Sequence, residues 1–403
     1  MLDERYKQSL IDDLCKLVRI PSRSFPSGGE EGELQRWVAE RMRRTGARVR
    51  TVEADNLPSF RVHPLCCGPE RNYRDRPTVI AEMGPEGAPA LLIAAHSDTV
   101  PISKFEEWTF SPFLGEVRDG KVCGLGSSDD KWGTASMLTI MRAVAESGRP
   151  LRKRLIFAST IDEENGVGNG LLLLMLAGVK AEAALYLDGY LMEILIGNSG
   201  GSNLYLRPKA PLMRELFQRH ATLLETACQE LSRRREALFA RPFYENSCVR
   251  RTSALLSTRE DSSGPFFLLA FYTVKGEEKG AVCRQFEDAV RKALGADLTL
   301  YETSYRTPWF EPALLEEKAP VVQLMARSLR AVRGVEPRIA VVSKQDVFVL
   351  HNHAKIPTIS FGVGQLEGRG THHQPDEAVS AEDVWTGCRI VHHAVTSWLE
   401  EQP

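Results

Sequence analysis

Three segments of this chain that have the pattern of buried strands are each followed closely by acidic or histidine side chains. These are residues 90–95 before His96, residues 153–160 before Asp162-Glu163-Glu164, and residues 183–187 before Asp188. Apolar runs of this length are typical of strands buried on both faces of a helix-covered sheet. In open α/β sheets, ligands bind beyond the carboxyl ends of the strands, so these polar side chains are expected to converge on one site.

The segments around these runs alternate between helical and strand patterns, which predicts the α/β class. We expect a catalytic domain with a central mixed sheet covered by helices. The predicted helices are residues 5–18, 31–45, 131–146, 171–176 and 320–333, and further strands are residues 47–52, 78–82 and 358–362.

The pattern changes between residue 198 and about residue 310. The predicted elements there are a strand at 202–206, a helix at 212–239, strands at 253–257 and 266–272, a helix at 277–294 and a strand at 297–303. This β-α-β-β-α-β order can form a compact inserted lid. Because 403 residues exceed what one hydrophobic core normally supports, we expect a catalytic domain at 1–198 and 311–403, with the lid domain at 199–310.

The composition and the apolar pattern argue against several classes of protein. The 51 basic and 53 acidic residues give a net charge of −2, so no basic excess favours a nucleic-acid partner. The N-terminal stretch lacks a signal-peptide pattern and no apolar run is long enough to cross a membrane. The eight cysteines show no CxxC spacing, which suits a reducing compartment. We therefore expect a cytoplasmic protein with no nucleic-acid or membrane partner.

The polar residues at the strand ends are of the types that bind metal ions. Zinc and similar ions take histidine nitrogen and carboxylate oxygen as ligands, and catalytic sites leave a position open for water. The chain offers His96 with Asp98, Asp129, Glu163-Glu164, Asp188 and His373. Each residue alone has an ordinary explanation, since an Asp-Asp pair often caps a helix. Their repeated occurrence directly after buried strands favours a metal site.

Several motifs occur together and in order along the chain. They read HSDTVP, DGKVCGLGSSDDKWG, DEENG, YLDG and HHQPDE. In this combination the chain resembles the dinuclear zinc family of aminoacylases, acetylornithine deacetylase, succinyl-diaminopimelate desuccinylase and glutamate carboxypeptidase. The resemblance covers most of the catalytic domain and implies the same inserted-lid architecture.

The resemblance implies a ligand set for two divalent metal ions. His96 and Asp188 would bind the first ion, Glu164 and His373 the second, and Asp129 would bridge both. Zinc suits this mixed nitrogen and oxygen set, and cobalt or manganese are alternatives.

The resemblance also implies roles for residues that do not bind metal. Glu163 would be the general base, and Asp98 would orient His96. The peptide bond between Asp129 and Asp130 is expected to be cis, as in the family.

The predicted lid departs from the family pattern. The family's Gly-x-x-x-His and Asp-x-Arg motifs are absent, and the lid's one histidine, His220, is interpreted as an ordinary helix-surface residue. Lys275 or Arg306 are candidates for binding a substrate carboxylate in place of the missing arginine.

The resemblance implies a hydrolase that cleaves an amide bond in an N-acyl amino acid or a small peptide, and a homodimer formed through the lid. Two alternatives stay open. One is a carboxypeptidase or dipeptidase of the same family, and the other is a catalytically silent relative that binds metal or acts as a scaffold.

Overall fold

The computed structural model describes residues 2–244, 253–261, 263–305, 309–365 and 371–401. The chain forms two compact units. Unit 1 contains Met1–Ile196, Leu315–Arg338 and Val349–Pro403, and unit 2 contains Gly197–Leu314 and Ile339–Phe348. The segment Ile339–Phe348, which the sequence-based division places in the catalytic domain, belongs to unit 2.

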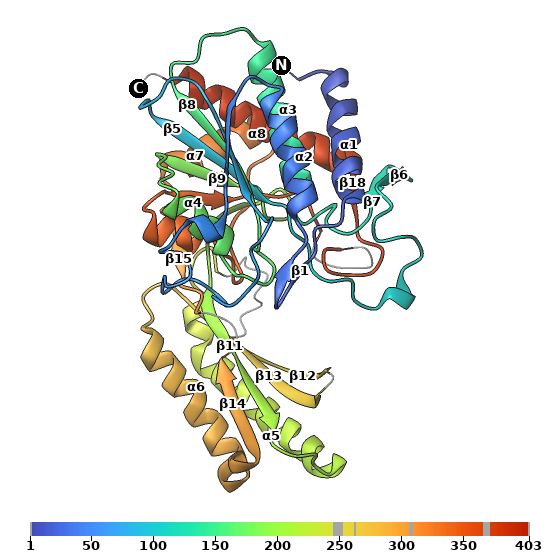
Figure 1. Ribbon diagram of the computed structural model, residues 1–403. Coiled ribbons are helices and arrows are strands. Elements are labelled where there is room, and N and C mark those ends of the chain that lie inside the picture. The colour runs from blue at the N-terminus through green and yellow to red at the C-terminus, as the bar shows by residue number, and fades with distance from the viewer. Residues whose placement is uncertain (1, 245–252, 262, 306–308, 366–370, 402–403) are drawn as a thin grey trace. The chain divides into compact units, whose positions relative to one another are not determined.

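Unit 1 is built on a mixed sheet with the strand order β10-β17-β9-β5-β8-β4-β3 (Figure 1). The four central strands β17, β9, β5 and β8 are parallel, and the pairs at both sides are antiparallel. The strands are β3 (Arg48–Val52), β4 (Thr78–Met83), β5 (Ala90–His96), β8 (Arg154–Thr160), β9 (Ala183–Tyr186), β10 (Ile194–Asn198, its first part) and β17 (Thr358–Ser360).

Helices cover this sheet and bury its central strands. Helix α2 packs on β3 and β4, α3 packs on β5, and α7 packs on β9 and β17. Every residue of β5 and β9 is buried, as the continuous apolar runs predict. The helices of unit 1 are α1 (Glu4–Arg19), α2 (Gly32–Arg43), α3 (Lys131–Glu146), α4 (Asn169–Leu176), α7 (Pro320–Arg333) and α8 (Ala381–Glu400).

The remaining elements of unit 1 are short. They are β1 (Ser24–Phe25), β2 (Gly28–Gly29), β6 (Glu116–Arg118), β7 (Lys121–Cys123), β18 (Ala378–Ser380), the 3-10 turns η1 (Ala54–Asn56) and η2 (Phe105–Glu107), and the π-helical turn η4 (Val349–His353). Strands β18, β7 and β6 form a small antiparallel sheet. Its β18–β7 pair joins the segment that follows His373 to the segment that precedes Asp129.

Unit 2 contains an antiparallel sheet with the order β12-β13-β11-β14 and two helices. Its hydrophobic core lies between the sheet and helices α5 and α6. The elements are β11 (Gly200–Pro208), α5 (Arg214–Phe239), β12 (Ala254–Asp261), β13 (Gly264–Thr273), α6 (Lys279–Leu294), η3 (Gly295–Leu300), β14 (Tyr301–Tyr305), β15 (Ala313–Leu314) and β16 (Ile339–Val342). The predicted β-α-β-β-α-β order of the lid is confirmed.

Two sequence-based expectations for the lid are wrong. Residues 297–300 of the predicted strand form the end of a 3-10 helix, so strand β14 begins only at Tyr301. His220 is fully buried rather than on the helix surface, because its ring nitrogens pair with the Tyr301 hydroxyl at 2.7 Å and with Asp297 at 3.0 Å.

The structure does not add support for Lys275 or Arg306 as the residue that binds a substrate carboxylate. The Nζ atom of Lys275 donates to the backbone oxygen of Leu314 at 2.8 Å. Arg306 lies outside the described residues.

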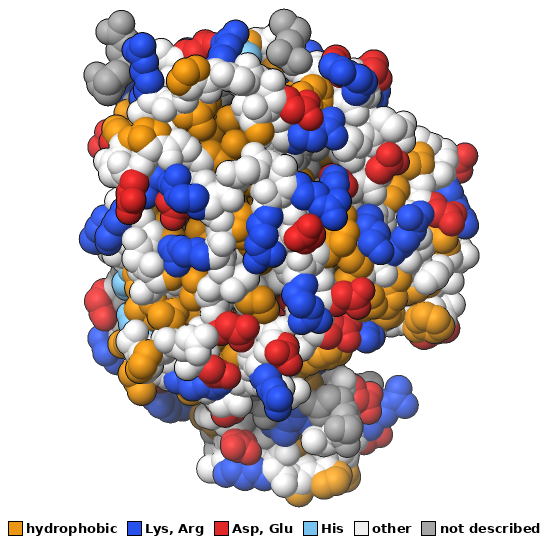
Figure 2. Space-filling view, turned by 45° about the horizontal axis from the view of Figure 1, so that its top comes forward, with side chains coloured by type: hydrophobic (Ala, Val, Ile, Leu, Met, Phe, Trp, Pro, Cys, Tyr) orange, Lys and Arg blue, Asp and Glu red, His pale blue; other side chains and the backbone are white. Residues whose placement is uncertain are grey.

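Basic and acidic side chains are interspersed over the face drawn in Figure 2. Among the residues that the structure describes, no helix has the length and apolar character needed to cross a bilayer.

Candidate metal centre

The site begins at the carboxyl end of β5, where His96 follows six buried apolar residues. The parallel register places His96 opposite Thr160 of β8, and Ala94 opposite Tyr186 of β9. The segments that follow these strands therefore leave the sheet side by side. This is why residues far apart in the sequence meet at one sheet edge.

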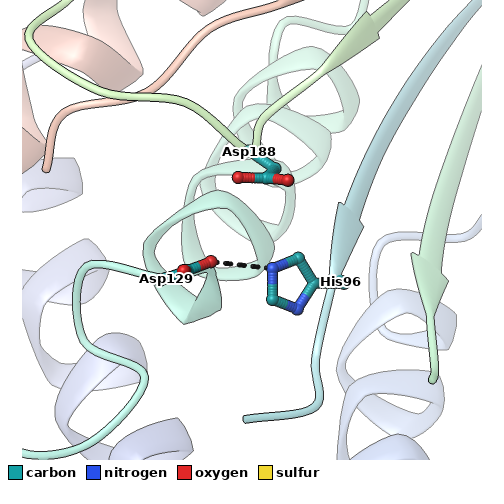
Figure 3. A group of neighbouring side chains, drawn as sticks. All are labelled: His96, Asp129 and Asp188. Atoms are coloured by element: carbon teal, nitrogen blue, oxygen red, sulfur yellow. Dashed lines mark hydrogen bonds and ion pairs between the residues drawn. The ribbon is translucent and has the colours of Figure 1, made fainter. Parts of the chain in front are cut away.

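His96, Asp129 and Asp188 form the first group of potential ligands. One ligand atom from each lies within 4.8 Å of the others. Figure 3 shows both carboxylates facing the His96 ring, with Asp129 supplied by the loop before α3 and Asp188 by the segment after β9. The Nε2 atom of His96 lies 2.8 Å from Oδ1 of Asp129. The ring of His96 is fully buried.

Asp129, Glu164 and His373 form a second group of ligand atoms, again within 4.8 Å of one another. The Nε2 atom of His373 lies 3.1 Å from Oδ2 of Asp129 and 3.0 Å from Oε1 of Glu164. The His373 side chain is 41% exposed, whereas that of Glu164 is 5% exposed. The second group is therefore the one open to solvent.

Asp129 belongs to both groups, and its two oxygens point to different histidines. Oδ1 faces His96 and Oδ2 faces His373. A carboxylate in this arrangement can bridge two cations with one oxygen on each. The peptide bond between Asp129 and Asp130 is cis, as expected from the resemblance.

Glu163 and Asp98 complete the centre without belonging to either group. A carboxylate oxygen of Glu163 lies within 4.8 Å of one of Asp188. The buried carboxylate of Asp98 accepts the backbone N–H groups of Glu163 at 3.1 Å and Glu164 at 3.0 Å. Its contact with Nδ1 of His96 is longer, at 3.6 Å. The backbone oxygen of Asp98 lies nearer that nitrogen, at 3.1 Å.

The histidines and carboxylates of the centre shift one another's pKa. Burial lowers the pKa of the His96 ring, but Asp129 and Asp98 more than offset this and raise it well above its usual value. Burial likewise opposes a charged His373, yet Glu164 and Asp129 raise its pKa to about 12. Burial would raise the pKa of Asp129, but hydrogen bonds with His373 and His96 hold it well below its usual value. The carboxylates beside each ring therefore favour a positive charge on His96 and on His373.

The donor set fits two divalent cations. Zinc takes histidine nitrogen and carboxylate oxygen at about 2.0–2.2 Å, so ligand atoms of one ion lie within a few ångströms of each other. Both groups meet this condition and share one carboxylate. Cations would displace the protons from the rings on binding.

Two sets of residues that support the site were not predicted from the sequence. Glu377, four residues after His373, accepts the backbone N–H and the hydroxyl of Ser128 at 3.0 and 2.8 Å, which ties the HHQPDE loop to the segment before Asp129. Glu377 is the last residue of the HHQPDE motif, and this position is the sequence feature that could have identified it. The second set surrounds Asp162 and comes from an irregular stretch near residues 71–76, which shows no periodic pattern.

Residues 92–397 match the family model described as "Peptidase family M20/M25/M40". The chain belongs to this family. Over 390 residues it is 28% identical to a succinyl-diaminopimelate desuccinylase of Methylorubrum extorquens, covering 91% of this chain and 93% of the relative. Over 122 residues it is 32% identical to a desuccinylase of Acinetobacter baumannii, covering 30% of each chain.

Solved structures of M20 relatives share the fold over nearly the whole length. Human carnosine dipeptidase 1 is 14% identical, with a TM-score of 0.73 over 99% of this chain and 98% of that one. A Bacillus subtilis dinuclear metal binding peptidase from the M20 family is 17% identical, with a TM-score of 0.58 over 99% of both chains. M20 membership makes this chain a metallohydrolase that acts on amide bonds.

Proposed function

We propose that this M20 hydrolase removes the acyl group from a small N-acyl amino acid, using two divalent metal ions, zinc in the first instance. The observation that carries the proposal is Asp129, whose two oxygens each face a separate ligand group. Full-length similarity to desuccinylases supports an acyl amide rather than a larger peptide as substrate.

In this proposal His96 and Asp188 hold one ion, Glu164 and His373 hold the other, and Asp129 is shared. When bound, the ions would polarise the substrate carbonyl and lower the pKa of a nearby water molecule. The partly exposed His373 marks the side from which solvent reaches the site.

Glu163 acts as the general base in this proposal. Its carboxylate lies beside Asp188, and its backbone is held by Asp98. It accepts a proton from the attacking water and passes it to the leaving amine nitrogen. A single side chain that can both accept and donate a proton is enough for these two steps. Asp98 would place this base and the ligand Glu164 together, because its carboxylate binds both of their backbone amides.

The first test combines metal analysis with a substrate panel. Purified protein is expected to contain about two metal ions per chain, as the two ligand groups imply. It should hydrolyse members of a panel of N-acyl amino acids, lose that activity on chelation, and regain it with zinc. Activity only on dipeptides would reject the deacylase proposal in favour of a peptidase. No turnover with both ions bound would favour the silent, metal-binding alternative.

A second test addresses Glu163. The Glu163→Gln variant is expected to bind about two ions and lose at least 100-fold in kcat, since general acid–base groups contribute about 10²–10⁴-fold. Glu86→Gln, which makes the same change at an exposed position of unit 1, serves as the control. Near-normal turnover of Glu163→Gln would remove this residue from its proposed role.

We further propose a homodimer formed through unit 2, in a cytoplasmic protein. One face of its sheet packs on α5 and α6, while Tyr205 and Phe266 stack on the other face at a centroid distance of 5.7 Å. On the adjacent strand β12, Leu255 is 47% exposed. Sedimentation analysis of the Leu255→Lys variant, which would shift the protein toward monomer, tests this proposal.

A further inference from the structure

The residue before the proposed base is held in an unusual way. Asp162 is fully buried and has a left-handed backbone conformation, with φ of 62°. The hydroxyl of Tyr73 donates to its Oδ2 atom at 2.7 Å, and Nη2 of Arg76 donates to Oδ1 at 3.0 Å. Arg71 forms an ion pair with the same carboxylate. Ser24 and Asn169 add further hydrogen bonds at 3.1 and 3.0 Å.

The residues that hold Asp162 are themselves fixed. Arg76 pairs with the buried carboxylate of Glu31 through two contacts of 2.6 Å. The ring of Tyr73 packs edge-on against Phe60 at a centroid distance of 5.1 Å, and both rings are buried. A side chain bound by partners that cannot move offers a rigid anchor for the chain on either side of it.

The backbone that follows Asp162 is held by a different side chain. Asp98 accepts the amides of Glu163 and Glu164, so three consecutive residues are anchored in the protein interior. Such anchoring matters for chemistry because a misplacement of about 1 Å in a reacting group can cost about 10²-fold in rate.

We propose that Arg71, Tyr73 and Arg76 are positioning residues that hold Glu163 in place through Asp162. They lie before residue 92, outside the stretch that matches the family model. The inference rests on the proposed role of Glu163 as the base. It predicts that loosening Asp162 lowers the rate of the chemical step without weakening substrate binding.

The test uses Tyr73→Phe, which removes one hydroxyl and keeps the packing of the ring. Asn169, which also contacts that hydroxyl, keeps its bonds to Asp162 and to the backbone oxygen of Cys67. The metal-loaded variant is expected to lose about tenfold in kcat, with KM within twofold of wild type. Metal content should stay at about two ions per chain.

Arg71 supplies a conservative pair of variants. Arg71→Met should reduce kcat more than Tyr73→Phe does, and Arg71→Lys should restore part of the loss, because of these two variants only the lysine keeps a cation at position 71. Arg74→Met is the matched control, since Arg74 lies in the same stretch with its side chain 86% exposed. The control should leave kcat, KM and metal content unchanged.

A purely structural role gives a different result. Unchanged kcat in Tyr73→Phe and Arg71→Met, with only a lower Tm, would overturn the inference, as would a loss of kcat that follows a loss of metal. If Glu163→Gln is inactive while Tyr73→Phe and Arg71→Met are fully active, the inference alone fails. If wild type shows no turnover, or Glu163→Gln keeps it, the proposed function fails and the inference falls with it.

Discussion

Replacing Asp98 by asparagine tests how one buried carboxylate holds the candidate metal centre together. Asp98 has no exposed surface and accepts two backbone amides, from Glu163 and Glu164. The asparagine side chain keeps one acceptor oxygen, and its NH₂ group must face the other amide. One N–H is then buried without an acceptor, next to a second donor.

The magnitude follows from those two hydrogen bonds. A hydrogen bond to a charged group contributes about 1.5–3 kcal/mol, and an amide left unpaired in the interior costs about 1–3 kcal/mol. Since these terms overlap, we expect Asp98→Asn to lower the free energy of unfolding by about 2–4 kcal/mol. For a unit of this size, that corresponds to a fall in Tm of about 5–15 °C. Loss of support for a metal-binding histidine typically weakens metal affinity by about 10–100-fold.

The assay is thermal unfolding of the metal-free and the zinc-loaded protein, together with a competitive zinc titration. Asp119→Asn makes the same change at an exposed position of unit 1 and should leave both measurements unchanged. A Tm of Asp98→Asn within about 1 °C of wild type, with unaltered zinc affinity, would refute the reasoning, because it would show that the two amides do not depend on the carboxylate.

Three further predictions follow from the same structure. His373→Ala should retain about one metal ion per chain by elemental analysis, since the buried group around His96 keeps its own ligands; two retained ions would contradict the assignment. Gly362→Ala should destabilise the fold by about 3 kcal/mol in chemical denaturation, because its Cβ would lie 1.9 Å from the backbone oxygen of Gly189. Burial lowers the pKa of His392 from 6.5 to about 4, so the unfolded chain binds a proton there that the folded chain does not. Stability should therefore fall as pH drops from 6.5 to 4, by up to about 3 kcal/mol, and His392→Gln should fall less; identical pH curves would refute this.

The parts of the fold that were predictable are those with a periodic pattern. The helix at residues 131–146 and the buried strands β5, β8 and β9 follow from apolar spacing, and the residues after those strands converge because parallel strands share a carboxyl edge. Strand β14 was placed too early, because residues 297–300 have no feature that separates a strand from a 3-10 turn.

The supports of the site were harder to predict. Arg71 and Arg76 meet Asp162 across 91 and 86 residues of sequence, from a stretch without helix or strand periodicity. Nothing in a single sequence pairs two such positions, because their contact depends on how the loop returns over the sheet. His220 was misjudged for a related reason, since the partners that allow its burial, Asp297 and Tyr301, lie about 80 residues later along the chain.

The order of the ligands along the chain has a consequence for how the protein is made. A ribosome completes the first ligand group at Asp188, before it starts unit 2 at Gly197. It adds His373, the last member of the second group, only after all of unit 2. The three members of the first group therefore all precede unit 2, whereas the second group cannot form before residue 373 has been synthesised. The two candidate ligand groups are thus completed at two stages of synthesis, with the residues of unit 2 made between them.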